Sequence, residues 1–169
     1  MMRRALLLAG CLLATGLARA ETAPPARTTT PEASLLRACI LGAARLHDVP
    51  SFALVVLLTV EGGKLGMRSP NTDGTGDLGP WQVNERWMPR LAAHWGLSRE
   101  ETHRLVRDDV CANADAAAWI FGLNLREVQG DLWEGVARYH SMRGHLQDKY
   151  LAKALRAVQA LKLEVRRDR

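Results

Sequence analysis

The sequence predicts a mainly α-helical domain with a small β-hairpin or loop beside a cleft. Three observations predict this fold class. Apolar residues recur at helical spacing along most of the chain after residue 31. Several of these segments begin with a residue that can cap a helix. No run outside residues 71–84 looks like a strand, and those residues, rich in Gly, Asn and Asp, favour a hairpin.

The expected helices are recognised by how they start. Thr30 is followed by a proline and an acid, whereas Ser98 and Asp131 each stand three residues before a glutamate in a capping box. These caps predict helices that begin at residues 31, 99 and 132. Further helices are expected over residues 50–61, 85–95 (interrupted by Pro89), 110–128 and 149–165.

Residues 1–20 have the features of a secretory signal peptide. Arg3 and Arg4 precede an apolar run, which ends in the Ala-x-Ala cleavage pattern Ala18–Ala20. The run is shorter than the roughly 20 residues that span a bilayer, so we expect no stable transmembrane anchor. Cys11 completes a pattern similar to a lipoprotein lipobox, which is the alternative route of export. In either case the expected location is periplasmic or secreted.

The charge of the mature chain gives no indication of nucleic acid as a partner. The formal charge of the whole chain is +5, but residues 1–20 hold three arginines and no acid, so +2 remains after their removal. The 149 residues left of 169 are enough for one domain. Residues 21–31, rich in Pro and Thr, predict a disordered linker, residues 32–165 the domain, and residues 166–169 a basic tail.

Cys39 and Cys111 are the cysteines that remain after the signal peptide. An even pair in an exported chain predicts a disulfide, which would stabilise the fold by about 4 kcal/mol in the chain-entropy model. Two buried free thiols are the alternative. There is no Cys-x-x-Cys motif and no pair of histidines at helical i, i+4 spacing, so we expect neither a metal site nor a cofactor.

Glu61 is the first candidate catalytic residue. It follows the uncharged run Pro50–Val60, which predicts a buried helix, or a buried strand as the alternative; Gly62 and Gly63 suit a helix end. Burial and the negative end of the helix dipole both raise the pKa of a carboxyl group. Such a group stays protonated near neutral pH and can act as a general acid. From this run alone, a solvated glutamate at a helix end is the other reading.

The loop that follows supplies further polar side chains. Asp77 lies sixteen residues after Glu61, and two carboxyl groups facing each other across a cleft are typical of glycoside hydrolysis. Gln82 and Asn84 offer amides suited to sugar hydroxyl and acetamido groups, and Trp81 offers a flat apolar face for a sugar ring. This combination within 27 residues favours a carbohydrate-active site over an ordinary turn.

Three short motifs resemble those of the soluble lytic transglycosylase domain. That family reads Glu-Ser, then Gly-Leu-Met-Gln, then Ala-x-Tyr-Asn. The corresponding residues here are Glu61–Gly62, Gly79–Gln82 and Ala137–His140. Gly62 stands in place of Ser and His140 in place of Asn, which leaves the roles of those two positions open. Pro and Trp replace Leu and Met in the second motif.

The same loop also resembles the active-site loop of animal-type lysozymes. The similar residues are Asn71–Gly79 and Gln82–Asn84, and the Asp that matches Asp77 is the second catalytic carboxylate of those enzymes. Both families have the lysozyme fold. The two resemblances therefore imply one architecture, with a cleft between the Glu61 helix and the loop, and two different chemistries.

The resemblance implies peptidoglycan glycan strands as the substrate. In the transglycosylase version Glu61 alone acts as acid and base, leaves a 1,6-anhydro-muramyl end, and is held by Tyr139. In the lysozyme version Asp77 assists and water completes the reaction. The small transglycosylases that this chain resembles accompany secretion, conjugation or pilus machines, which implies such an apparatus as a partner. A wall-binding adaptor that does not cut is the third reading.

Overall fold

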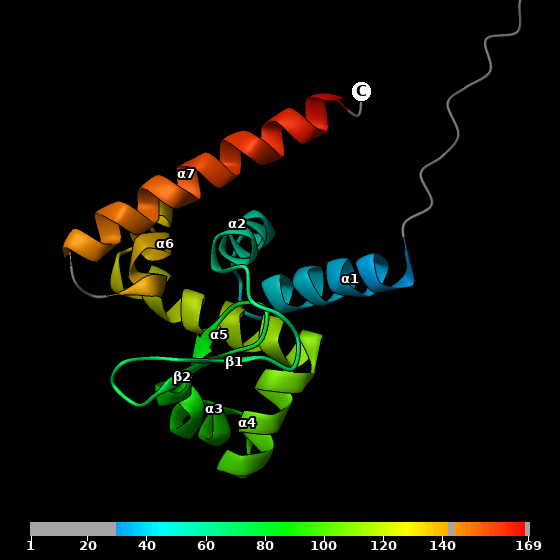
Figure 1. Cartoon of the computed structure of the whole chain (residues 1–169), viewed down its shortest axis with the longest axis vertical. Coiled ribbons are helices and arrows are strands. Elements are labelled where there is room, and N and C mark those ends of the chain that lie inside the picture. Colours follow the sequence, from blue (N-terminus) through cyan, green and yellow to red (C-terminus); the bar gives the residue numbers. More distant parts are fainter. Residues whose placement is uncertain (1–29, 142–143, 168–169) are drawn as a thin grey trace, which may run out of the picture.

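The computed structural model describes residues 30–141 and 144–167. It confirms a mainly helical fold with a small antiparallel sheet (Figure 1). The expected signal peptide, with the lipobox-like Cys11, lies outside the described residues, as do residues 21–29 and 168–169. The elements are α1 (Pro31–Leu46), α2 (Ser51–Glu61), β1 (Arg68–Pro70), β2 (Gly76–Leu78), β3 (Val83–Asn84), the 3-10 turn η1 (Glu85–Trp87), α3 (Met88–Trp95), α4 (Arg99–Asp108), α5 (Val110–Glu127), α6 (Leu132–His140) and α7 (Gly144–Arg167).

The helix caps predicted from the sequence are confirmed. The side chains of Thr30, Ser98 and Asp131 each accept a hydrogen bond from a backbone N–H in the first turn of the helix that follows. Pro89 lies in the first turn of α3, so it begins that helix rather than interrupting one. The last helix starts five residues earlier than expected and continues through the first two residues of the expected basic tail.

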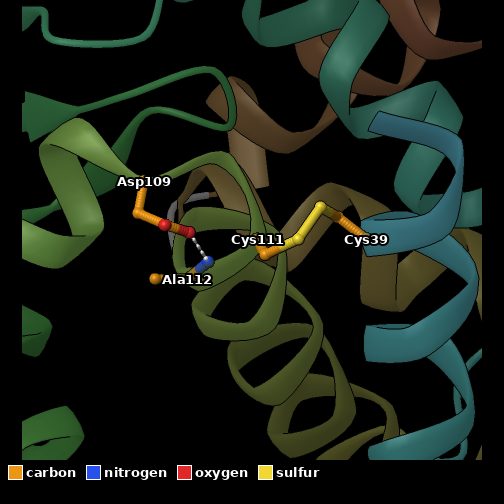
Figure 2. Close-up of a disulfide and its surroundings, with 4 residues drawn as sticks. All are labelled: Cys39, Asp109, Cys111 and Ala112. Carbon is orange, nitrogen blue, oxygen red and sulfur yellow. Dashed lines mark hydrogen bonds between the residues drawn. A yellow bond between two sulfur atoms is a disulfide. The ribbon is translucent and has the colours of Figure 1, made fainter. Parts of the chain in front are cut away.

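The central helix α5 packs against α1, α4 and α6 (Figure 1). Its buried face is made largely of alanines, whose small side chains let neighbouring helices approach closely. The predicted disulfide is confirmed: Cys39 of α1 is bonded to Cys111 in the first turn of α5, with 4.7 Å between their Cα atoms (Figure 2). Asp109 caps the same turn by accepting a hydrogen bond from the N–H of Ala112 at 2.8 Å.

The expected hairpin is part of a three-stranded antiparallel sheet in the order β1-β2-β3. The sheet starts at Arg68, before the predicted hairpin, and pairs Asp77 with Asn84. Glu85 fastens the sheet: it accepts hydrogen bonds from the Arg68 guanidinium at 2.7 and 2.8 Å, from the Gly76 N–H at 2.7 Å, and it contacts a His103 ring nitrogen at 2.8 Å. Among the described residues, no helix combines the length and the apolar character needed to cross a membrane.

Candidate active site

Glu61 is the last residue of α2. The helix forms because its residues are almost all apolar and bury one side against the core, with Leu54 and Leu57 fully buried. It ends because Gly62 adopts the left-handed conformation (φ 61°), in which glycine is favoured, and returns its N–H to the Leu58 carbonyl. The helix predicted for this run is therefore confirmed, and the alternative of a buried strand is wrong.

The half-buried carboxyl group of Glu61 has a pKa raised to about 7. Burial is the largest cause, and the negative charge of Asp77 raises the pKa further. A hydrogen bond from Tyr150 and the positive charge of Lys153 act in the opposite direction. A carboxyl group with this pKa exists in both protonation states near neutral pH, which suits a general acid and base.

Tyr150 is the residue that holds Glu61, and the sequence motifs did not identify it. Its hydroxyl donates a hydrogen bond to Oε1 of Glu61 at 2.6 Å, and its side chain is only 4% exposed. Tyr150 begins the buried stripe of α7 that continues through Ala154, Ala157 and Val158. This helical spacing is visible in the sequence, and a buried tyrosine on it needs a partner for its hydroxyl.

Tyr139, which was expected to hold Glu61, makes a different hydrogen bond. Its hydroxyl donates to the backbone carbonyl of Trp81 at 3.1 Å. Burial, together with the charges of Glu61 and Asp77, raises the pKa of Tyr139 well above its usual value. Tyr139 therefore lies beside the two carboxyl groups and supports the loop, whereas the direct hydrogen bond to Glu61 comes from Tyr150.

Asp77 and Asn84 lie opposite each other on β2 and β3. The amide nitrogen of Asn84 donates to Oδ1 of Asp77 at 2.7 Å and to the Thr75 hydroxyl at 3.2 Å. The amide oxygen of Asn84 accepts a hydrogen bond from the N–H of Arg86 and so caps η1. In this arrangement Asn84 orients Asp77, and the sugar contact expected of Asn84 stays a prediction.

Trp81 is a core residue, so the expected stacking of its ring on a sugar is a misinterpretation. The side chain is fully buried, and its indole N–H donates to the Leu54 carbonyl at 2.9 Å. Its backbone N–H donates to the buried side chain of Asn113, which in turn donates to the Leu78 and Val106 carbonyls. Asn113 therefore fixes the loop on the core. No feature of the sequence around Asn113 predicts this role.

Gln82 is half-buried and adopts a left-handed backbone conformation (φ 49°). Its side-chain amide donates to the Gly79 carbonyl at 2.8 Å. Gly63 lies against the same turn and donates its N–H to the Pro80 carbonyl at 3.2 Å, leaving no space for a Cβ atom. The end of α2 and the loop are thus joined by backbone contacts, which fix Glu61 relative to Asp77.

The described residues contain no group of three His, Cys, Asp or Glu side chains placed to hold a metal ion. What they bring together is a half-buried carboxyl group with a raised pKa, a phenol that donates to it, and a second carboxylate on the facing sheet. Comparison of the chain with models of protein families and with curated protein sequences finds no match.

Proposed function

We propose that the protein is a peptidoglycan lytic transglycosylase that cleaves the β-1,4 bond between N-acetylmuramic acid and N-acetylglucosamine. The observation that carries the proposal is the state of Glu61, a half-buried carboxyl group with a pKa of about 7 at the edge of a polar loop. The choice of substrate rests on the resemblance of the Glu61–Gln82 segment to transglycosylase and lysozyme motifs.

The proposed reaction uses Glu61 twice. Protonated Glu61 gives its proton to the glycosidic oxygen, the bond breaks, and positive charge develops on the anomeric carbon of the muramyl residue. The acetamido oxygen of that residue assists. The Glu61 carboxylate then takes the proton of the C6 hydroxyl, whose oxygen bonds to the anomeric carbon. Glu61 ends protonated, the sugar ends as a 1,6-anhydro residue, and no water is consumed.

The surroundings of Glu61 suit both halves of this cycle. Burial and the Asp77 charge favour the protonated acid that starts the reaction. Tyr150 and Lys153 favour the carboxylate that exists between the two proton transfers. Because these opposing effects leave the pKa near neutrality, neither proton transfer faces a large energetic penalty.

A lysozyme-type hydrolysis is the second candidate, and Asp77 is the observation that favours it. Asn84 orients this carboxylate, and its negative charge acts on Glu61. In the hydrolytic version Asp77 stabilises or attacks the anomeric carbon, and a water molecule completes the reaction.

We further infer that this activity opens the cell wall for an envelope-spanning machine. The inference rests on the resemblance to small transglycosylases of secretion, conjugation and pilus systems. The Cys39–Cys111 disulfide is compatible with a location outside the cytoplasm, and periplasmic or secreted remains the proposed location.

The experiment that tests the proposal is mass analysis of the glycan fragments released from peptidoglycan. The protein without residues 1–20 is compared with Glu61→Gln and Asp77→Asn. Fragments that are lighter by one water and resistant to borohydride, still released by Asp77→Asn, are the expected result. Reducible, hydrated ends that disappear in Asp77→Asn would assign the hydrolase instead. Binding to the wall without release of fragments would reveal an adaptor.

A further inference from the structure

His140 is the last residue of α6, at the position where the transglycosylase motif has asparagine. Its imidazole ring lies face to face with the ring of Tyr150, with 4.7 Å between the ring centroids and 5° between the planes. The hydroxyl of Tyr150 in turn donates to Glu61 at 2.6 Å. Three side chains from α6, α7 and α2 thus form a continuous series that ends on the proposed acid.

The imidazole of His140 covers one face of the Tyr150 ring. Tyr150 is almost entirely buried, whereas His140 is exposed, so the imidazole forms the outer wall of the tyrosine. Gln147 donates to the carbonyl of Ser141 at 3.0 Å and ties the first turns of α7 to the end of α6. A hydrogen bond weakens steeply when its angle changes, so a free tilt of the phenol ring would weaken its bond to Glu61.

We propose that His140 is a positioning residue that holds the Tyr150 phenol against Glu61 and thereby sets how firmly Glu61 keeps its proton. The proposal rests on the proposed function, in which Glu61 is the acid. His140 touches neither the carboxyl group nor, in this scheme, the reacting atoms; it acts through the tyrosine.

The charges around His140 favour a neutral ring in this role. His140 is exposed as a residue, but its ring is partly shielded from water, and this partial burial and the positive charge of Lys153 on α7 lower its pKa, whereas Asp77 on β2 acts in the opposite direction. The groups that act on Glu61 itself are Tyr150, Asp77 and Lys153. A neutral imidazole contributes a flat face rather than a charge, so another flat ring at this position is expected to replace it.

The test is a carbon-13 NMR titration of the Glu61 carboxyl group, assigned by its loss in Glu61→Gln. Tyr150→Phe removes the hydrogen bond that favours the carboxylate, so the midpoint of the Glu61 titration should rise by about one pH unit. His140→Ala should move the midpoint in the same direction, and His140→Asn should do the same because asparagine also lacks the ring. His140→Phe should restore the wild-type midpoint. His145→Ala, at an exposed histidine in the first turn of α7, is the matched control.

The double variant decides whether His140 acts through Tyr150. His140→Ala combined with Tyr150→Phe should titrate like Tyr150→Phe alone. Full additivity, an unchanged midpoint in both His140→Ala and His140→Asn, or a failure of His140→Phe to restore it would each overturn the proposal. Because NMR does not require turnover, a wild-type protein that releases no glycan fragments would refute the proposed function and leave this test intact. In an active protein, His140→Ala should lower kcat, leave KM unchanged and move the alkaline limb of the pH profile upward.

Discussion

Glu61 and Glu85, which flank the loop and sheet between α2 and η1, have pKa values shifted in opposite directions. Glu61 ends α2, is half-buried and has a pKa raised to about 7, mainly by burial. Glu85 begins η1 and has a pKa lowered to about 2, mainly by its hydrogen bonds with the Arg68 guanidinium. Glu61 receives a hydrogen bond from one neutral phenol, whereas Glu85 is surrounded by a guanidinium, an imidazole and a backbone N–H.

The difference shows how one side-chain type is divided between chemistry and structure. A carboxylate that is saturated with donors cannot take up a proton near neutral pH, so Glu85 can only hold the sheet together. A carboxyl group with little solvent and one neutral donor can both lose and regain a proton. The surroundings of the two carboxyl groups therefore distinguish Glu61, the proposed acid, from Glu85, which holds the sheet together, without reference to any sequence motif.

The largest expected effect is on catalysis. Glu61→Gln should lower the release of glycan fragments by about 10³-fold, because the amide cannot transfer a proton. The rate is measured with purified peptidoglycan, and Glu164→Gln, at an exposed position of α7, serves as the control. Substantial residual activity in Glu61→Gln would remove Glu61 from the mechanism.

The second effect is on stability against pH. The pKa of Glu61 is higher in the folded protein than its ordinary value of 4.5, so its contribution to stability is fully present below about pH 4.5 and is lost as the pH rises through about 7. The expected loss is on the order of 1–3 kcal/mol. Urea denaturation at pH 5 and pH 8 should show this loss in the wild type and not in Glu61→Gln. If the free energy of unfolding changed equally between pH 5 and pH 8 in the two proteins, the raised pKa of Glu61 would be contradicted.

Glu85 should show the opposite dependence. Its pKa is lowered in the folded state, so its contribution is present above about pH 4.5 and is lost as the pH falls toward 2. Glu85→Gln should lower the free energy of unfolding at pH 7 by about 1 kcal/mol, a value kept small because water screens the exposed Arg68 partner. The free energy of unfolding of Glu85→Gln should also fall less than that of the wild type as the pH is lowered from 4.5 toward 2. If the variant lost as much stability as the wild type over this range, Glu85 would not be holding the sheet through its ionised carboxylate.

The smallest expected effect concerns Asp77. Its negative charge raises the pKa of Glu61, so Asp77→Asn should move the alkaline limb of the activity profile to lower pH by less than about one unit. Anhydro products should still form. An unchanged alkaline limb would show that the charge of Asp77 does not act on Glu61.

The sequence predicted those parts of the molecule that depend on local chemistry. The caps at Thr30, Ser98 and Asp131 and the helix that ends at Glu61 follow from residue type and spacing, and the structure contains them. The Cys39–Cys111 bond was predicted from the even number of cysteines left after the expected signal peptide, and it is present as well. The local sequence around Glu61 also contained the main reason for its raised pKa, which is burial at the end of an apolar helix.

The remainder of the site depends on which helices meet. Tyr150 is 89 residues from Glu61, and only the packing of α7 on α2 brings its hydroxyl to the carboxyl group. Trp81 looked like a sugar platform because its neighbours are polar, but its ring fills the core beside α2. The contacts of Glu85 likewise come from residues of β1, β2 and α4, and no spacing along the chain predicts that these residues lie close together.

The disulfide has a mechanical consequence when the chain is pulled from its N-terminal end. Tension applied ahead of α1 would travel along that helix to Cys39 and pass across the covalent bond into Cys111 and the central helix. The segment between the two cysteines, which includes α2 and the whole sheet, is then a closed loop that carries no load. Tension along the chain would therefore bypass the backbone that carries Glu61 and the sheet.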